Sequence, residues 1–418
     1  MNVNTTNKAG CFSAADVLLP ENCDLRRWAV IACDQFTSQP EYWAQVALET
    51  RDVPSAAHLI LPECELTGST DEKIRAIHRN MERCLQEALL CAYPDSFIYL
   101  ERTLQNGQIR RGLVGKVDLE QYDYTGTVDA AVRATEQTVS ERIPPRMAVR
   151  RGAALELPHV LLLCNDERCD IIEPLSAHRD FMPQLYDFDL MMGGGHIAGW
   201  LVTGEEKRAL EARIAEYETR EREKHPDAAL LYAVGDGNHS LATAKACFEE
   251  LKAQHPGESF ADHPARFALC ELNNIHDPSQ VFEPIHRIVK NCDAEKLIRD
   301  LSNCPASASA TEIPWVSEAG SGKLRVENQG DLLPLAILQD ALDRWLTENG
   351  GELDYIHGDA ALATLEHEKG CVGFRLPALD KASLFPGILS GGVLPRKTFS
   401  MGEAEEKRYY LEARRILP

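Results

Sequence analysis

The 418-residue chain carries 44 Lys and Arg residues against 65 Asp and Glu residues, a formal net charge of −21. Nucleic-acid-binding proteins gain affinity by replacing phosphate counterions with Lys and Arg, so this charge argues against a nucleic-acid partner. It also disfavours an anionic membrane surface. With 44% hydrophobic and 26% charged residues, the composition is that of a globular protein of two or three domains.

Cysteine usage and the N-terminal sequence indicate a cytoplasmic protein. The thirteen cysteines are scattered, and none forms a CxxC pair, so we expect reduced thiols and no structural zinc site. The first 28 residues lack the basic start and apolar stretch of a secretory signal. No apolar run approaches the length that crosses a bilayer.

The first half of the chain mixes helical and strand patterns. An apolar strand is predicted at residues 28–32, and it is followed by a polar loop that contains Asp34 and leads into a helix, with Thr37 or Ser38 as its cap. Apolar residues three or four apart predict a helix over 71–92. Further predicted elements are a hairpin of strands 97–100 and 111–117, a stiff extended turn at 144–145, and strands at 159–164 and 171–172.

The second half continues without the regular spacing of a Rossmann or TIM pattern. Helices are predicted at 205–224, 241–252 and 335–346, strands at 228–234, 265–272 and 281–289, and a linker or long loop at 302–330. The fold class predicted is α+β with mixed sheets. Three regions are expected: an N-terminal α+β region at 1–204, a loop-bearing core at 205–301, and a C-terminal α+β region at 302–418 that completes the site.

The most specific local feature is the sequence Tyr-Ala-Val-Gly-Asp-Gly-Asn-His-Ser at 232–240, a strand that breaks on two glycines and enters a helix. Such a junction directs backbone amides and the positive end of a helix dipole at one spot, which suits a phosphate. Asp236 fits there as a Mg²⁺ ligand or as the acceptor of a substrate proton, and His239 as a donor to phosphate. Ser240 would cap the helix or contact the ligand. The alternative interpretation is a tight turn without chemistry.

The loop resembles the ADGHHR-type loop of the family called domain of unknown function 1015. Three further segments resemble that family in the same order along the chain: 133–136 (Arg-Ala-Thr-Glu), 283–287 (Glu-Pro-Ile-His-Arg) and 394–399 (Leu-Pro-Arg-Lys-Thr-Phe). The loop also resembles the Asp-Gly-x-His-Arg signature of the ParB/sulfiredoxin superfamily, in which it grips nucleotide phosphates and some members phosphorylate free serine. This resemblance implies a ParB/sulfiredoxin-like core.

The resemblance implies a small-molecule kinase that uses Mg²⁺ and ATP or ADP, with the hydroxyl of free L-serine as leading acceptor. Gly235, Gly237, Asn238 and Ser240 would then hold phosphate, and Asp236 and His239 would act at the transferring group. The superfamily loop has Arg where this chain has Ser240, so another cation must substitute if the chemistry is retained. Candidates are Arg133, Arg287 and Lys397. A non-catalytic nucleotide-binding or regulatory protein is the alternative.

Two carboxylates are candidates for the general base. Asp34 follows a predicted strand directly, a common position for active-site carboxylates. Glu136 lies three residues after Arg133, so on a helix the two side chains would share a face and could form an exposed ion pair. In the alternative interpretation, Arg133 binds phosphate and Glu136 is a metal ligand or the general base. His286 and Arg287 are adjacent in a predicted strand and should face opposite sides.

Overall fold

The computed structural model describes residues 10–66, 68–126, 130–302, 310–327 and 332–418. The chain divides into two compact units. Unit 1 consists of residues 1–134, 138–280 and 403–418, and unit 2 consists of residues 135–137 and 281–402. The C-terminal segment therefore returns to unit 1. The three-region division at 204/205 and 301/302 is a different partition of the chain and stays a prediction.

Unit 1 is built on a mixed sheet that combines antiparallel and parallel ladders. Among the described residues, the strands in spatial order are β10 (Gln184–Asp189), β11 (His196–Val202), β4 (Leu90–Thr103), β5 (Ile109–Asp118), β13 (Phe267–Asn274), β9 (Leu161–Cys164), β12 (Tyr232–Asp236), β7 (Val132–Ala134) and β6 (Tyr122–Asp123). Beside this path, β1 (Phe12–Ser13) pairs with β5 and β2 (Ala15–Pro20) with β4. Two short ladders pair β20 (Tyr409–Tyr410) with β3 (Val30–Ile31) and β21 (Arg414–Arg415) with β8 (Leu155–Glu156).

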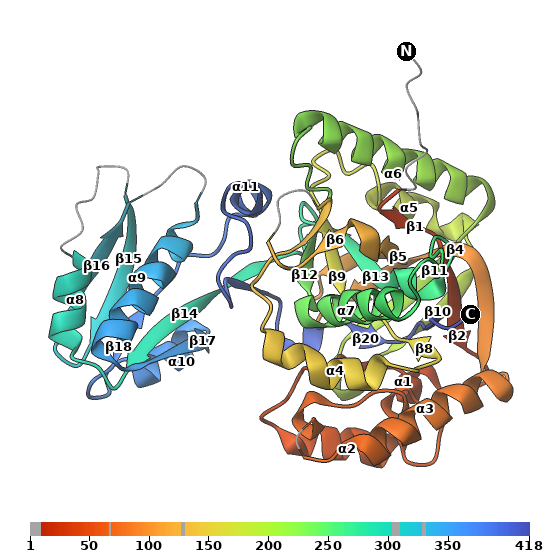
Figure 1. The fold of residues 1–418 in the computed structure, drawn as a ribbon, viewed down its shortest axis with the longest axis horizontal. Helices are drawn as coiled ribbons and strands as arrows, with labels where there is room; N and C mark the ends of the chain where they lie inside the picture. The colour runs from red at the N-terminus through yellow and green to blue at the C-terminus, as the bar shows by residue number, and fades with distance from the viewer. Residues whose placement is uncertain (1–9, 67, 127–129, 303–309, 328–331) are drawn as a thin grey trace. The chain divides into compact units, whose positions relative to one another are not determined.

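The helices of unit 1 surround this sheet (Figure 1). They are α1 (Leu25–Trp28), α2 (Pro40–Thr50), α3 (Asp71–Gln86), α4 (Ile143–Arg150), α5 (Glu173–His178), α6 (Gly204–Lys224) and α7 (Asn238–Gln254). Short 3₁₀ turns are η1 (Ala56–His58), η2 (Glu63–Glu65), η3 (Leu119–Gln121), η4 (Ser140–Arg142), η5 (Arg179–Phe181), η6 (Met191–Gly193), η7 (Pro264–Arg266) and η8 (Ala404–Glu406). Helix α7 packs along α4 and follows directly from the end of β12.

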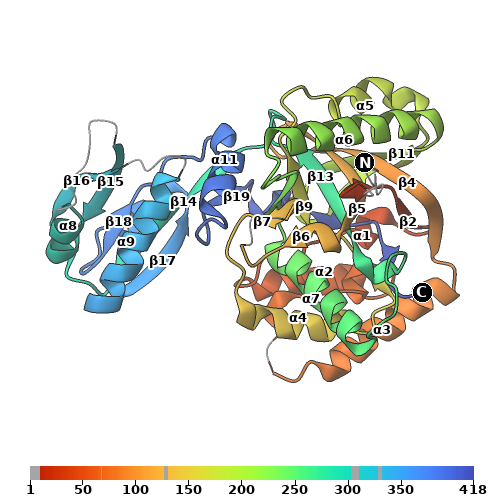
Figure 2. The same ribbon diagram turned by 45° about the horizontal axis from the view of Figure 1, so that its top comes forward.

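Unit 2 is a smaller α+β unit in which helices cover a largely antiparallel sheet (Figure 2). Its described strands in order are β16 (Gly320–Val326), β15 (Thr311–Ser317), β18 (Val372–Phe374), β14 (Phe282–Lys290) and β17 (Glu352–His357), with β19 (Phe399–Met401) paired to β14. Its helices are α8 (Ala294–Ser302), α9 (Pro334–Asn349), α10 (Asp359–Leu365) and α11 (Lys381–Gly391). Val289 packs in the core with α8 and α9, whereas its neighbour Ile288 packs with α10. The side chains of these two successive strand residues thus point to opposite faces of the sheet.

The α+β class with mixed sheets is confirmed, and four local predictions are wrong. The predicted linker at 302–330 contains the β15–β16 hairpin in its described part, because Ile313, Leu324 and Val326 are buried in the core of unit 2. Residues 171–172 are buried ahead of α5 and form no strand. The proline pair 144–145 begins α4, since proline suits the first helical turn. Arg133 lies in β7 and so does not share a helix face with Glu136.

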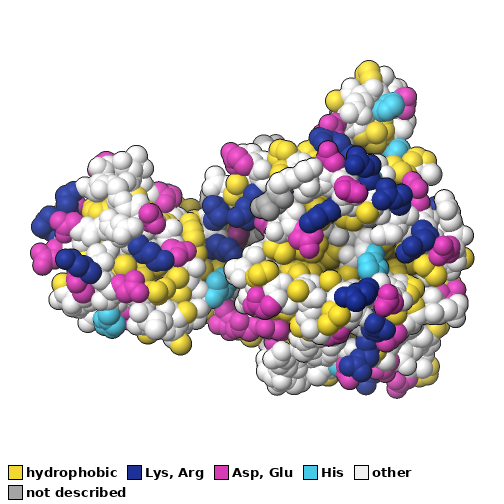
Figure 3. All heavy atoms as spheres, turned by 90° about the horizontal axis from the view of Figure 1, so that it is seen from below, with side chains coloured by type: hydrophobic (Ala, Val, Ile, Leu, Met, Phe, Trp, Pro, Cys, Tyr) yellow, Lys and Arg dark blue, Asp and Glu magenta, His cyan; other side chains and the backbone are white. Residues whose placement is uncertain are grey.

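In the space-filling view, acidic and basic side chains are interspersed over the visible face (Figure 3). No helix in the described part of the chain is both long enough and apolar enough to cross a membrane.

Candidate functional site

The junction between β12 and α7 has the geometry that the glycines predict. Gly237 is in the left-handed region, with φ of +83°, and α7 begins at the next residue. A Cβ on Gly237 would lie 3.0 Å from Cδ2 of His159 and 3.1 Å from Cα of Val160. The loop therefore needs glycine both for its backbone conformation and for its close approach to the 159–160 segment.

Gly237→Ala is expected to lower the free energy of unfolding by about 1–3 kcal/mol, because a left-handed non-glycine backbone is strained and the new methyl group meets neighbouring atoms. Gly257→Ala is the matched control. Its φ is +90° and nothing lies within 4 Å of its Cβ position, so it reports the backbone strain alone. Urea unfolding of both variants measures the difference; equal losses would contradict the packing contribution.

The carboxylate of Asp236 is held at the end of β12 by two contacts. Its Oδ1 accepts a hydrogen bond of 2.9 Å from the Gly237 amide, and its Oδ2 lies 3.3 Å from Nζ of Lys407. The two side chains are 24% and 11% exposed, so the pair is sheltered but reachable. Lys407 reaches the loop from the C-terminal segment. It is a functional candidate that the sequence analysis missed.

Asp34 is brought to the same region by the β3–β20 ladder. Tyr409 pairs with Ile31 and Tyr410 with Val30, and the Ala32 amide bonds to the carbonyl of Arg408. Burial acts to raise the pKa of Asp34. Lys407, His159 in its protonated form and a hydrogen bond from Gln35 outweigh that effect and hold the pKa below its usual value. Asp34 is thus a carboxylate throughout the neutral range, as a general base requires.

A chain of hydrogen bonds leads from Ser240 into the interior. Ser240 Oγ lies 2.6 Å from His159 Nε2, and His159 Nδ1 lies 2.7 Å from the Tyr410 hydroxyl oxygen. That oxygen accepts a hydrogen bond of 3.2 Å from the amide of Cys33, a residue with a free thiol. Burial raises the pKa of this thiol to about 12, so it stays neutral. His159 itself is buried at 8% exposure.

Two capping predictions are wrong because the helices begin at other residues. Ser240 is the third residue of α7, whose N-cap is Gly237, and its hydroxyl turns to His159 instead. Helix α2 has Gln39 at its N-cap and Pro40 in its first turn, so neither Thr37 nor Ser38 caps it.

The remaining loop residues lie at the first turn of α7. Asn238 and His239 are its first two residues, and His239 Nε2 accepts a hydrogen bond of 3.2 Å from the Val139 amide. This contact fixes the proton on Nδ1 and joins the loop to residue 139. Gly235 is the fourth residue of β12 and precedes Asp236.

Arg133 belongs to β7 and is buried at 3% exposure. Its guanidinium donates to the carbonyls of Ala130 and Ala228, at 2.8 and 2.9 Å. Ala228 precedes β12, whereas Asp236 ends it, so this guanidinium is directed toward the beginning of the strand. Its phosphate-binding role stays a prediction.

Three predicted residues come together in unit 2. Glu136 Oε1 accepts a hydrogen bond of 3.1 Å from the Thr398 amide, and Glu136 forms an isolated parallel β-bridge with Leu394. Arg287 is fully buried, donates to the carbonyls of Arg396 and Lys397 at 3.0 and 2.9 Å, and lies 4.5 Å over the Tyr355 ring. Burial lowers the pKa of Arg287 to about 10, which still leaves it charged at neutral pH.

Lys397 is exposed on this segment and has a left-handed backbone, with φ of +56°. His286 turns to the opposite side of β14 from Arg287, as predicted, and accepts from the Leu376 amide at 3.1 Å. The ligand roles of Glu136, Arg287 and Lys397 remain predictions.

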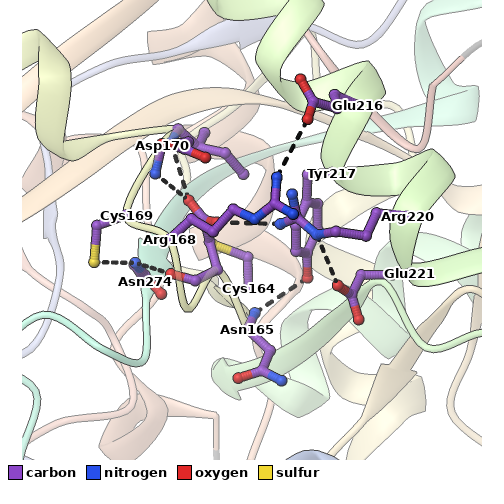
Figure 4. A network of polar contacts seen from close by, with 12 residues as sticks. Cys164, Asn165, Arg168, Cys169, Asp170, Glu216, Tyr217, Arg220, Glu221 and Asn274 are labelled. Atoms are coloured by element: carbon purple, nitrogen blue, oxygen red, sulfur yellow. Dashed lines mark hydrogen bonds and ion pairs between the residues drawn. The ribbon is translucent and has the colours of Figure 1, made fainter. Parts of the chain in front are cut away.

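A separate polar network lies where β9 and β13 end, at the other end of the central strands from Asp236 (Figure 4). Asp166 accepts from the amides of Asp170 and Ile171 and lies 3.3 Å from Arg220 of α6. Asn274 donates to the Asp166 carbonyl at 2.9 Å. These contacts bind the 165–171 loop to α6 and β13, and we assign them a structural role.

A Mg²⁺ ion commonly takes one or two carboxylates, with substrate phosphates and water completing its shell. No group of three or more His, Cys, Asp or Glu side chains suited to a metal occurs within the described ranges. Asp236 fits the more modest requirement, since it is a partly exposed carboxylate beside the first turn of a helix.

The chain belongs to the family described as "Protein of unknown function (DUF1015)", whose model matches residues 17–382. The search of curated proteins found no match to the chain.

Similar solved structures include a free serine kinase in complex with AMP, at 12% identity and a TM-score of 0.38, covering 72% of this chain and 91% of that one. A conserved hypothetical protein from Pyrococcus furiosus has 14% identity and a TM-score of 0.33, with 71% and 90% covered. C-terminally truncated SbnI from Staphylococcus aureus has 10% identity and a TM-score of 0.36, with 69% and 82% covered. All three likenesses are remote.

Proposed function

We propose that the protein is a small-molecule kinase that transfers a phosphoryl group from ATP or ADP to the hydroxyl of a small metabolite. The observation that supports this proposal is the group formed by Asp236, Lys407 and Asp34 beside the glycine loop at the start of α7. Phosphoryl transfer depends on positioning and on neutralising charge, and this group supplies a carboxylate, a cation and a second carboxylate of lowered pKa.

Each residue has a role in this proposal. The backbone of Gly235, Gly237 and Asn238 forms the phosphate loop, in which the Gly237 amide also donates to Asp236, and His239 contacts the transferring group. Asp236 is the Mg²⁺ ligand, and the metal, when bound, neutralises phosphate charge. Lys407 replaces the arginine that the superfamily loop carries where this chain has Ser240. Asp34 is the general base of this unit 1 site. The resemblance also implies Glu136 as a base and Arg133, Arg287 and Lys397 as phosphate ligands, and those roles stay predictions.

Phosphorus NMR of the pure protein with Mg²⁺ and ATP or ADP tests the proposal, using a panel of hydroxylated acceptors that begins with L-serine. We expect a new phosphomonoester signal, and we expect Asp236→Asn to reduce its rate of formation by at least about 100-fold. Thermal melts verify that the variant is folded. Unchanged turnover in Asp236→Asn would contradict the assigned site.

The alternative is a non-catalytic nucleotide-binding or regulatory protein, which the absence of the loop arginine favours. It predicts that ATP or ADP raises the melting temperature while no acceptor is phosphorylated.

A further inference from the structure

An apolar cavity of about 160 Å³ adjoins the end of the Ser240–His159 pair in unit 1. Its wall is mostly aliphatic and is contributed by several elements of unit 1, among them Met81 of α3, Val149 of α4, Leu241 and Ala244 of α7, and Leu269 of β13. An apolar cavity of about 150 Å³ in another protein stays dry and binds benzene. The cavity here can therefore hold a ring or short chain of that size.

The charged groups that line the cavity are already paired with one another. Arg146 lies 2.6 Å from Glu63, and Arg150 lies 2.6 Å from Glu156. A charged ligand would lose its hydration without gaining a counter-ion from these groups. The chemistry of the lining thus favours a neutral ligand.

Ser240, His159 and Tyr410 form a hydrogen-bonded chain at the polar end of the cavity. His159 lies between two hydroxyl groups, with its Nδ1 2.7 Å from the Tyr410 oxygen and its Nε2 2.6 Å from Ser240 Oγ. The proposed proton path uses the tautomer that carries its proton on Nδ1, in which His159 donates to Tyr410 and Nε2 accepts from the Ser240 hydroxyl. Ser240 Oγ keeps lone pairs that can accept from the hydroxyl of a ligand.

We propose that the acceptor of the phosphoryl group is a neutral small molecule with an apolar body and a hydroxyl, whose body fills this cavity and whose hydroxyl proton passes through Ser240 to His159. The inference rests on the proposed kinase activity and names its substrate class. The acceptor oxygen forms a bond to the transferring phosphorus as the bond from that phosphorus to the nucleotide oxygen breaks. The acceptor proton moves to Ser240 Oγ, and the Ser240 proton moves to His159 Nε2. His159 thus receives the proton directly in place of Asp34 or Glu136, and the Asp34 carboxylate balances the imidazolium charge.

Ligand-observed saturation-transfer NMR with toluene, benzyl alcohol and benzoate tests the binding step. We expect signals for toluene and benzyl alcohol and none for benzoate. Ala244→Phe fills this cavity and should abolish them. Ala57→Phe, in a different cavity of unit 1, is the matched control and should not. Ala268→Leu fills the same cavity from β13 if Ala244→Phe does not fold. Absence of binding to the native protein, equal binding to the filled variants, or displacement of benzyl alcohol by ADP would overturn the inference.

Turnover tests the acceptor class and the proton path. With ATP and Mg²⁺, we expect benzyl phosphate to form faster than phosphoserine. Ser240→Ala should lower kcat by about 100-fold while toluene binding is retained, and Ser240→Thr should restore most of the rate. Faster formation of phosphoserine would overturn the inference and leave the kinase proposal standing. Benzyl alcohol binding without a phosphoester from any acceptor would refute the kinase proposal, and with it the assignment of the bound molecule as an acceptor.

Discussion

Glu271→Gln is expected to lower the free energy of unfolding of unit 1 by about 3–5 kcal/mol, because it removes one partner from a buried ionic network. Glu271 is fully buried on β13, where its Oε2 lies 2.9 Å from Arg408 and its Oε1 accepts from Asn273 at 3.0 Å. Arg408, itself 2% exposed, also pairs with Glu412. Glutamine keeps the shape but leaves the arginine with less compensating charge in a buried site.

The control for this prediction is Glu250→Gln, which breaks the surface pair of Glu250 with Arg151 and should cost no more than about 1 kcal/mol. Urea unfolding followed by circular dichroism measures both variants. A loss for Glu271→Gln as small as that of the control would show that the network contributes little.

The same network gives a pH dependence with a defined sign. Burial acts to raise the pKa of Glu271, but the charges of Arg408 and Arg110 outweigh it, and the pKa lies below its usual value. A lowered pKa means that the stabilisation is present above the unfolded-state pKa and is lost as the pH falls through the folded one. The difference between native protein and Glu271→Gln should therefore be constant near pH 7 and shrink in acid.

Much of the fold follows from local sequence patterns. The apolar periodicity of α3, the Asn-Gly turn between β4 and β5 and the charged helix α6 were predicted near their observed positions. The β15–β16 hairpin was missed because its polar and small residues resemble a linker, while only alternate positions such as Ile313 are buried. Burial of that kind depends on the partner elements, which a single segment does not reveal.

The site was predictable where one segment supplies it and not where distant segments meet. The glycine–aspartate loop at 235–240 is local, and the structure places it at a helix start as expected. Lys407 and Tyr410 reach this loop only because β20 pairs with β3, a contact between the two ends of the chain. The sequence predicted His159 as the first residue of an apolar strand. Nothing in that segment indicated that both ring nitrogens have hydrogen-bond partners.

Lys407→Met should reduce phosphoryl transfer by at least about 100-fold under the kinase proposal, because it removes the cation beside Asp236. Lys245→Met is the control, since Lys245 lies on α7 but pairs with Glu249 and should affect the rate little. Lys407 also helps to lower the pKa of Asp34, so its loss should raise that pKa and move the acid limb of kcat/KM to higher pH. The residual activity of Lys407→Met, measured against pH, tests both effects together. A lower rate with an unshifted acid limb would mean that Lys407 acts on the phosphate and that Asp34 is not the titrating base.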